Sequence, residues 1–229
     1  MTEFQHPVAG YVFVVTYGRS GSTLLQNLIN AVPGCLVRGE NNNALFALYR
    51  SWCALVRSPD IARMVASAEA SDPSHPWFGA EAIDTDAYAR GLCASFAQHV
   101  LRPSNETRIC GFKEIRTIAD ETRFRDYLEF INTHFPNARF VFNTRNHAGV
   151  AKSSWWRQHD PAEVGKMMRS AETVFAEFVA SHPERSVSLH YDTYVSDQNA
   201  FEPLFELLGA RPADSQIRTV LDTRLTHAT

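Results

Sequence analysis

Short runs of strand-forming apolar residues alternate along the chain with longer segments in which apolar residues recur every three or four positions. The runs predict five strands, at residues 11–16, 35–37, 108–114, 138–143 and 186–190. The periodic segments predict helices between them, because this spacing places apolar side chains on one face of a helix. Strands that alternate with helices favour a parallel sheet covered by helices on both faces.

The predicted helices lie at about residues 21–31, 45–55, 61–70, 84–100, 124–135, 150–157, 161–180, 201–208 and 217–221. Either Asp84 or Asp86 is placed to cap the fourth helix, and Asp160 with Pro161 forms a start signal for the seventh. The pattern is weakest over 58–100, where residues 71–76 form a polar loop. We therefore expect one α/β domain over residues 1–229, with a helical insertion or lid at about 58–100.

The first predicted strand ends in a turn of small residues, and a helix follows at once. Residues 17–23 of this turn have the sequence YGRSGST. Gly18 and Gly21 let the backbone close around a phosphate, and the unpaired N–H groups at the start of the helix favour an anion. Arg19 adds further donors. The turn is not the nucleotide triphosphatase motif G-x-x-x-x-G-K-[ST], because Ser22 stands in the place of the lysine. An ordinary strand-to-helix turn is the alternative.

The composition carries no strong charge and no targeting signal. A formal net charge of −3 excludes the strongly basic surface of a nonspecific nucleic-acid binder. The four cysteines form no C-x-x-C pair and no ligand spacing, so we expect buried thiols in a reducing compartment and no bound metal. No apolar run is long enough to span a membrane and residues 1–7 lack a basic leader region, so we expect a cytoplasmic protein.

Polar clusters follow all five predicted strands, at residues 17–23, 38–40, 113–116, 144–147 and 191–192. Parallel α/β sheets bind ligands at the carboxyl ends of their strands, so these clusters are expected to converge on one crevice. Arg145, with the Ser153 hydroxyl 8 positions later, makes a second anion pocket. Two anion pockets on one crevice imply a ligand with anionic groups at both ends of a nucleoside.

Three segments resemble motifs of the sulfotransferases. Residues 19–25 (RSGSTLL) look like the 5′-phosphosulfate loop of that family. Residues 142–145 (FNTR) through 153–156 (SSWW) resemble its 3′-phosphate motif, including the spacing from Arg145 to Ser153. Residues 111–116 (GFKEIR) are similar to a strand-end segment of bacterial and carbohydrate-type members. The resemblance covers the first forty residues and 108–160. Arg19 replaces the lysine of many cytosolic members, and His147 replaces the usual proline after the 3′-phosphate arginine.

The resemblance implies a P-loop-NTPase-like three-layer fold and 3′-phosphoadenosine 5′-phosphosulfate as the donor. The reaction would be in-line transfer of the sulfuryl group to a hydroxyl or amine of a carbohydrate, lipid or small natural product. A sulfuryl group carries less charge than a γ-phosphoryl group, so this transfer needs no Mg²⁺. The residues implied to hold the donor are Arg19, Ser20, Gly21, Ser22, Thr23, Leu24, Arg145 and Ser153.

The resemblance also implies the catalytic groups. Glu40 is the first choice for the general base, because it ends the second predicted strand beside the anion loop, where related bacterial members place an acidic residue. Lys113 is assigned to the transferring group, together with Arg19. Lys113 and Glu114 are neighbours on a strand and point to opposite faces, so they are not expected to share one task.

Several alternatives stay open at this point. Glu114, His147 and Asp192 are the other candidates for the base, with Asp192 expected to be structural. A metal-dependent P-loop kinase or NTPase is a second possible function, against which the missing lysine argues, and a non-catalytic nucleotide-binding protein is a third. The partner is expected to be a small-molecule or glycan acceptor rather than a nucleic acid. The acceptor's identity and the oligomeric state are not predicted.

Overall fold

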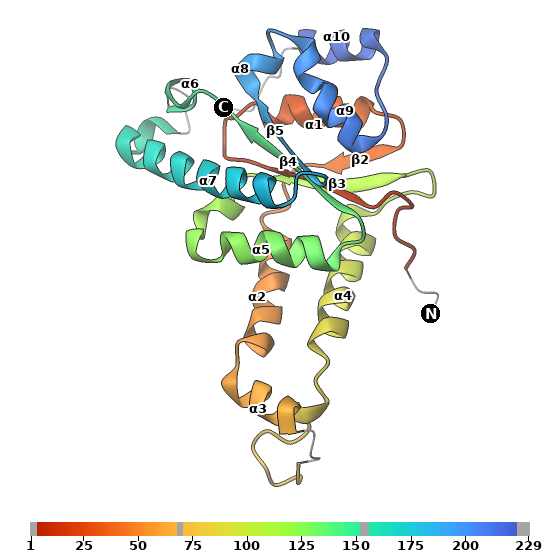
Figure 1. The fold of residues 1–229 in the computed structure, drawn as a ribbon, viewed down its shortest axis with the longest axis vertical. Helices are drawn as coiled ribbons and strands as arrows, with labels where there is room; N and C mark the ends of the chain where they lie inside the picture. Colours follow the sequence, from red (N-terminus) through yellow and green to blue (C-terminus); the bar gives the residue numbers. More distant parts are fainter. Residues whose placement is uncertain (1–3, 68–70, 152–155, 224–229) are drawn as a thin grey trace.

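A parallel five-stranded sheet forms the centre of the computed structural model, which describes residues 4–67, 71–151 and 156–223. The strands are β1 (Tyr11–Val15), β2 (Cys35–Arg38), β3 (Ile109–Glu114), β4 (Ala138–Thr144) and β5 (Ser186–His190). They lie in the order β2-β3-β1-β4-β5 (Figure 1). The five predicted strands are therefore confirmed, with ends that differ by one residue at most.

The register of β1 brings the predicted polar clusters to one edge of the sheet. Val15, at the end of β1, is paired with Glu114 on β3 and with Phe142 on β4. All the strands are parallel, so the residues that follow β1, β3 and β4 leave the sheet on the same side. The predicted convergence of these segments is confirmed.

Two layers of helices cover the sheet, because the strand residues alternate between its faces. Phe13 on β1 belongs to an aromatic cluster on one face, whereas Val12 and Val14 belong to a smaller aliphatic cluster on the other. The helices that contribute to the first cluster include α5 (Glu121–His134) and α7 (Pro161–Ser181). Those of the second face are α1 (Ser22–Ala31), α8 (Tyr191–Tyr194), α9 (Glu202–Leu208) and α10 (Asp214–Asp222). The three-layer α/β fold is confirmed.

The segment between β2 and β3 forms a helical arm. Its helices are α2 (Ala44–Val56), α3 (Pro59–Ser67) and α4 (Thr85–Phe96), which continues as π-helical Ala97–Leu101. Asp84 caps α4 by accepting hydrogen bonds from the N–H groups of Asp86 and Ala87. In Figure 1 α2 and α4 extend away from the sheet and α3 lies at the far end of the arm. A lid function for residues 58–100 stays a prediction.

The segment after β4 differs from the prediction. The helix expected at 150–157 begins earlier, as α6 (His147–Ala151), because the Asn146 side chain accepts hydrogen bonds from the N–H groups of Ala148 and Gly149. Residues 152–155 lie outside the described part of the chain, and Trp156–Gln158 is a 3₁₀ turn. The short helix α8 was not predicted. None of the helices within the described residues is both long and apolar enough to cross a membrane.

Candidate active site

The glycine turn after β1 leaves an uncapped helix N-terminus at the edge of the sheet. Arg19 and Gly21 adopt left-handed backbone conformations, with φ of 68° and 81°. Helix α1 begins at Ser22, and no side chain of the described residues caps it. The N–H groups of the first helical turn need partners, and the helix dipole favours a negative charge there. The turn is therefore suited to bind an oxyanion.

Buried polar contacts hold this turn against β4. The Oγ1 of Thr16 lies 2.7 Å from both the Oγ of Ser20 and the carbonyl oxygen of Asn143. The amide of Asn143 donates to the carbonyl oxygen of Ser20 at 2.9 Å and accepts from the hydroxyl of Tyr194 at 3.1 Å. Asn143 was missed as a site residue. Its signals in the sequence are an amide directly after the apolar run 140–142 and its place in segment 142–145 (FNTR).

Gly21 is packed directly against Tyr191, the first residue of α8. A methyl group at position 21 would overlap the Tyr191 ring, and the left-handed backbone adds strain. We expect Gly21→Ala to destabilise the protein by more than the roughly 1–3 kcal/mol of the strain alone. The matched control is Gly79→Ala, because Gly79 has φ of 83° and no neighbour that its Cβ would meet. Thermal denaturation measures both variants, and an equal loss in the two would contradict the packing argument.

Arg145 reaches the glycine turn from the end of β4. Its Nη1 donates to the carbonyl oxygen of Arg19 at 3.1 Å, and its guanidinium carbon lies 4.3 Å from the centre of the Tyr191 ring. The Nε is buried and has no hydrogen-bond partner among the described residues. An unpaired buried donor is costly, so this atom is suited to an anionic ligand. The predicted partner Ser153 lies outside the described residues, so its role stays a prediction.

Tyr17, itself hydrogen-bonded to Glu172, holds the backbone of Arg145 in place. The Tyr17 hydroxyl accepts from the Arg145 N–H at 2.9 Å and donates to Glu172 Oε1 at 2.7 Å. Burial raises the pKa of Tyr17, so its hydroxyl stays protonated and able to donate. His147 Nε2 lies 2.9 Å from the same Glu172 oxygen, and Asp192 accepts from the N–H of Asn146 at 2.9 Å. Both base candidates on this side therefore support the turn after β4.

Glu40 and Lys113 meet on the other side of the glycine turn. The Nζ of Lys113 donates to Glu40 Oε1 at 2.6 Å, and Nη1 of Arg116 donates to Glu40 Oε2 at 2.7 Å. Burial raises the pKa of the Glu40 carboxyl, but the hydrogen bonds and charges of Lys113 and Arg116 outweigh this and leave the pKa lowered. The strand β3 lies between β2 and β1, so Glu40, which follows β2, contacts residues at the end of β3. The expected place of Glu40 beside the anion loop stays a prediction.

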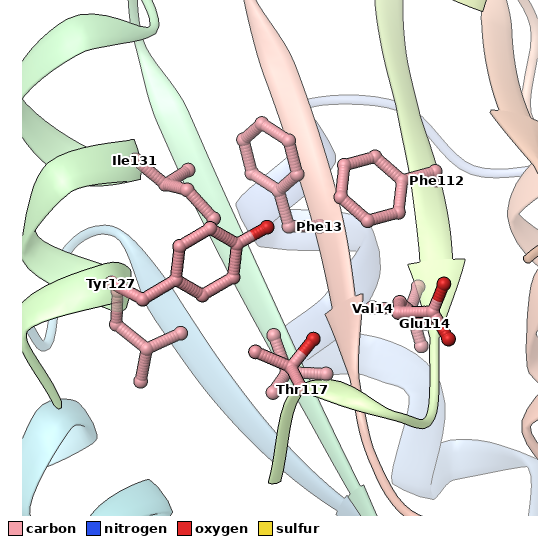
Figure 2. Close-up of a pocket in the computed structure, with 9 residues that line it drawn as sticks. Phe13, Val14, Phe112, Glu114, Thr117, Tyr127 and Ile131 are labelled. Carbon is pink, nitrogen blue, oxygen red and sulfur yellow. The ribbon is translucent and has the colours of Figure 1, made fainter. Parts of the chain in front are cut away.

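A small cavity lies on the opposite face of the sheet, the face that α5 covers. Figure 2 shows Phe13, Glu114, Thr117 and Tyr127 around a cavity of about 10 Å³ between the sheet and α5. That volume holds about one water molecule, so the cavity is too small for an acceptor. Glu114 lines this cavity, as the alternation of side chains along β3 predicts. That it does not share the task of Lys113 stays a prediction. Among the described residues, no group of three or more His, Cys, Asp or Glu side chains could hold a metal ion.

Comparisons with known proteins show the fold and the family of this chain. The chain is similar to the sulfotransferase domain of the olefin synthase of Synechococcus PCC 7002, with a TM-score of 0.60, 17% identity and coverage of 97% of this chain and 81% of that domain. It is also similar to the sulfotransferase domain from the curacin biosynthetic pathway, with a TM-score of 0.57, 14% identity and coverage of 96% and 79%. No curated protein sequence matches it. A family model described as "Sulfotransferase family" matches residues 11–210, so the chain belongs to the sulfotransferase family.

Proposed function

We propose that this enzyme transfers a sulfuryl group from 3′-phosphoadenosine 5′-phosphosulfate to a hydroxyl or amine of an acceptor. The observation that supports this most is the contact of Arg145 Nη1 with the carbonyl oxygen of Arg19. It brings an uncapped helix N-terminus and a guanidinium with an unused donor to the same edge of the sheet. A donor with anionic groups on both sides of its adenosine requires two groups of this kind.

The proposed donor site consists of the glycine turn and of Arg145 with Ser153 beside it. The backbone N–H groups of residues 20–24, with the side chains of Arg19, Ser22 and Thr23, would hold the 5′-phosphosulfate. Arg145 and Ser153 would hold the 3′-phosphate. The bound donor supplies an activated sulfuryl group. An arginine and a helix N-terminus are sufficient to stabilise the leaving phosphate, because the transferred group carries less charge than a γ-phosphoryl group.

Glu40 is proposed as the general base and Lys113 as the cation that contacts the transferring group. The acceptor oxygen bonds to sulfur as the bond from sulfur to the 5′-phosphate oxygen breaks, and the acceptor proton passes to Glu40. Lys113 forms a hydrogen-bonded ion pair with Glu40 in this structure. A shift of its Nζ to an oxygen of the sulfuryl group would remove one cation from Glu40 and raise the pKa of that carboxyl. Glu40 would then become a stronger base at the moment of transfer.

The acceptor is proposed to be a carbohydrate, a lipid or a small natural product. The side chain of Glu40 is 30% exposed, so the proposed base is open to solvent. An acceptor that is much larger than its reacting hydroxyl can therefore approach it from outside. The cavity beneath the sheet is too small to select among these classes.

Thermal denaturation with adenosine 3′,5′-bisphosphate tests the donor assignment. We expect a clear rise in Tm with the bisphosphate and a much smaller one with adenosine 5′-monophosphate, because only the bisphosphate engages Arg145 as well as the glycine turn. A rise with Mg·ATP alone would favour the kinase or NTPase alternative, and no rise with the bisphosphate would contradict the proposal.

Labelled donor incubated with host extract, followed by mass spectrometry, then tests for a sulfated product. Donor binding without any transfer would favour a non-catalytic protein.

A further inference from the structure

One buried carboxylate connects the loop after β2 to the turn after β3. Glu114, the last residue of β3, is 2% exposed. Its Oε2 accepts from the N–H groups of Asn43 at 2.8 Å and Asn41 at 3.3 Å. Its Oε1 accepts from the N–H groups of Ile115 at 2.9 Å and Arg116 at 3.1 Å. A carboxylate that accepts several backbone N–H bonds fixes the positions of those backbone groups.

The loop that Glu114 holds has an unusual backbone. Asn42 and Asn43 both adopt left-handed conformations, with φ of 57° and 58°. Asparagine adopts this region more readily than other non-glycine residues, but two consecutive residues in it still need contacts that hold the conformation. Thr117 adds a second contact to the same loop, because its hydroxyl donates to the side-chain oxygen of Asn43 at 3.2 Å. The turn after β3 therefore imposes the conformation of the segment that begins directly after Glu40.

Arg116 links Glu114 to Glu40 through its side chain as well. Its Nη1 lies 2.7 Å from Glu40 Oε2 and 3.3 Å from Glu114 Oε1. One guanidinium nitrogen thus lies between the two carboxylates, while Lys113 holds the second oxygen of Glu40. The position of Glu40 is set from both sides by groups that the end of β3 carries.

We infer that Glu114 is a positioning residue for the proposed base Glu40, acting through the backbone of residues 41–43 and through Arg116. This inference rests on the proposed function. Glu114 itself lines the small cavity on the face of the sheet that α5 covers (Figure 2), and its carboxylate is linked to that of Glu40 through Arg116. Its removal is expected to displace Glu40 and to leave the donor site of the glycine turn and Arg145 intact.

The test compares Glu114→Gln, Glu40→Gln and the double variant in the full-length chain. Turnover is the release of adenosine 3′,5′-bisphosphate from the sulfated donor with water as the acceptor. We expect Glu114→Gln to keep the thermal shift with the bisphosphate and the KM for the donor, and to lose at least about tenfold in kcat, because small displacements of a reacting group are costly. The double variant is expected to be no slower than Glu40→Gln, because nothing remains to be positioned.

Hydrogen exchange provides a readout that does not depend on turnover. In Glu114→Gln the backbone N–H groups of residues 41 and 43 should exchange at least about tenfold faster. Glutamine has one acceptor oxygen where glutamate has two, so some of these hydrogen bonds are lost. Thr117→Val provides the same test with a milder change if Glu114→Gln fails to fold. Leu204→Ala, a core truncation on the other face, controls for lost stability and should change neither the exchange at these amides nor kcat.

Two results would overturn the inference. One is unchanged exchange at these amides in Glu114→Gln, and the other is a double variant whose loss of kcat equals the product of the two single losses. A wild-type chain without a bisphosphate shift would instead count against the proposed function.

Discussion

Arg145→Ala is expected to lose most of the thermal shift that adenosine 3′,5′-bisphosphate produces in the wild-type protein. The guanidinium is preorganised for an anion, because Tyr191 lies against its plane, Arg19 orients Nη1 and Tyr17 holds the backbone N–H. Its buried Nε has no hydrogen-bond partner among the described residues, so a ligand phosphate that reaches it would form a charge-assisted bond without breaking a hydrogen bond of that atom within the protein. A bond of this kind contributes about 1.5–3 kcal/mol, which corresponds to roughly 10- to 100-fold in affinity. Titration calorimetry with the bisphosphate measures that loss directly.

The matched control for this variant is Arg211→Ala. Arg211 also lies over an aromatic ring, that of Phe205, with its guanidinium carbon 5.7 Å from the ring centre. It is paired with Glu202 and Asp214 at the surface. Its removal tests the loss of an arginine that is stacked but has no proposed ligand. Equal affinity for the bisphosphate in Arg145→Ala and Arg211→Ala would remove the main support for the donor site.

Glu40→Gln is expected to lower turnover by about 10²- to 10⁴-fold, the usual contribution of a general base. Binding of the bisphosphate should be unchanged, because Glu40 contacts the end of β3 and not the glycine turn. The measurement is kcat for bisphosphate release, together with the Kd of the bisphosphate for each variant. Turnover that survives the substitution would mean that another group accepts the proton.

The pH profile gives a second check on the same residue. Lys113 and Arg116 hold the pKa of Glu40 below its ordinary value, so the wild-type enzyme should lose activity only at strongly acidic pH, as the carboxylate becomes protonated. Arg116→Gln removes one of these cations, which raises the pKa of Glu40 and should shift the acid limb of the profile toward neutral pH. A shift to lower pH, or none at all, would contradict the assignment of that limb to Glu40.

Local patterns along the chain were sufficient to predict the five strands, most of the longer helices and the fold class. The start of α7 at Pro161 and the span of β5 at Ser186–His190 match their predictions, because a helix cap and a short strand of alternating polar and apolar residues are properties of a few neighbouring residues. The placement of Arg145 near the glycine turn was also predictable. The end of β4 must lie at the same sheet edge as the end of β1 once the strands are parallel.

The sequence by itself thus determined a parallel α/β sheet, a glycine turn suited to an oxyanion and the arginine that meets it. Only the tertiary structure decided that β3 lies between β2 and β1, and hence that Glu40 pairs with Lys113. It also decided that Asn143 holds Ser20, 123 positions away, and that Tyr17 holds Glu172, 155 positions away. Periodicity and capping signals describe neighbours in the chain, whereas these pairs depend on strand order and on which helix covers which face. No local pattern contains that information.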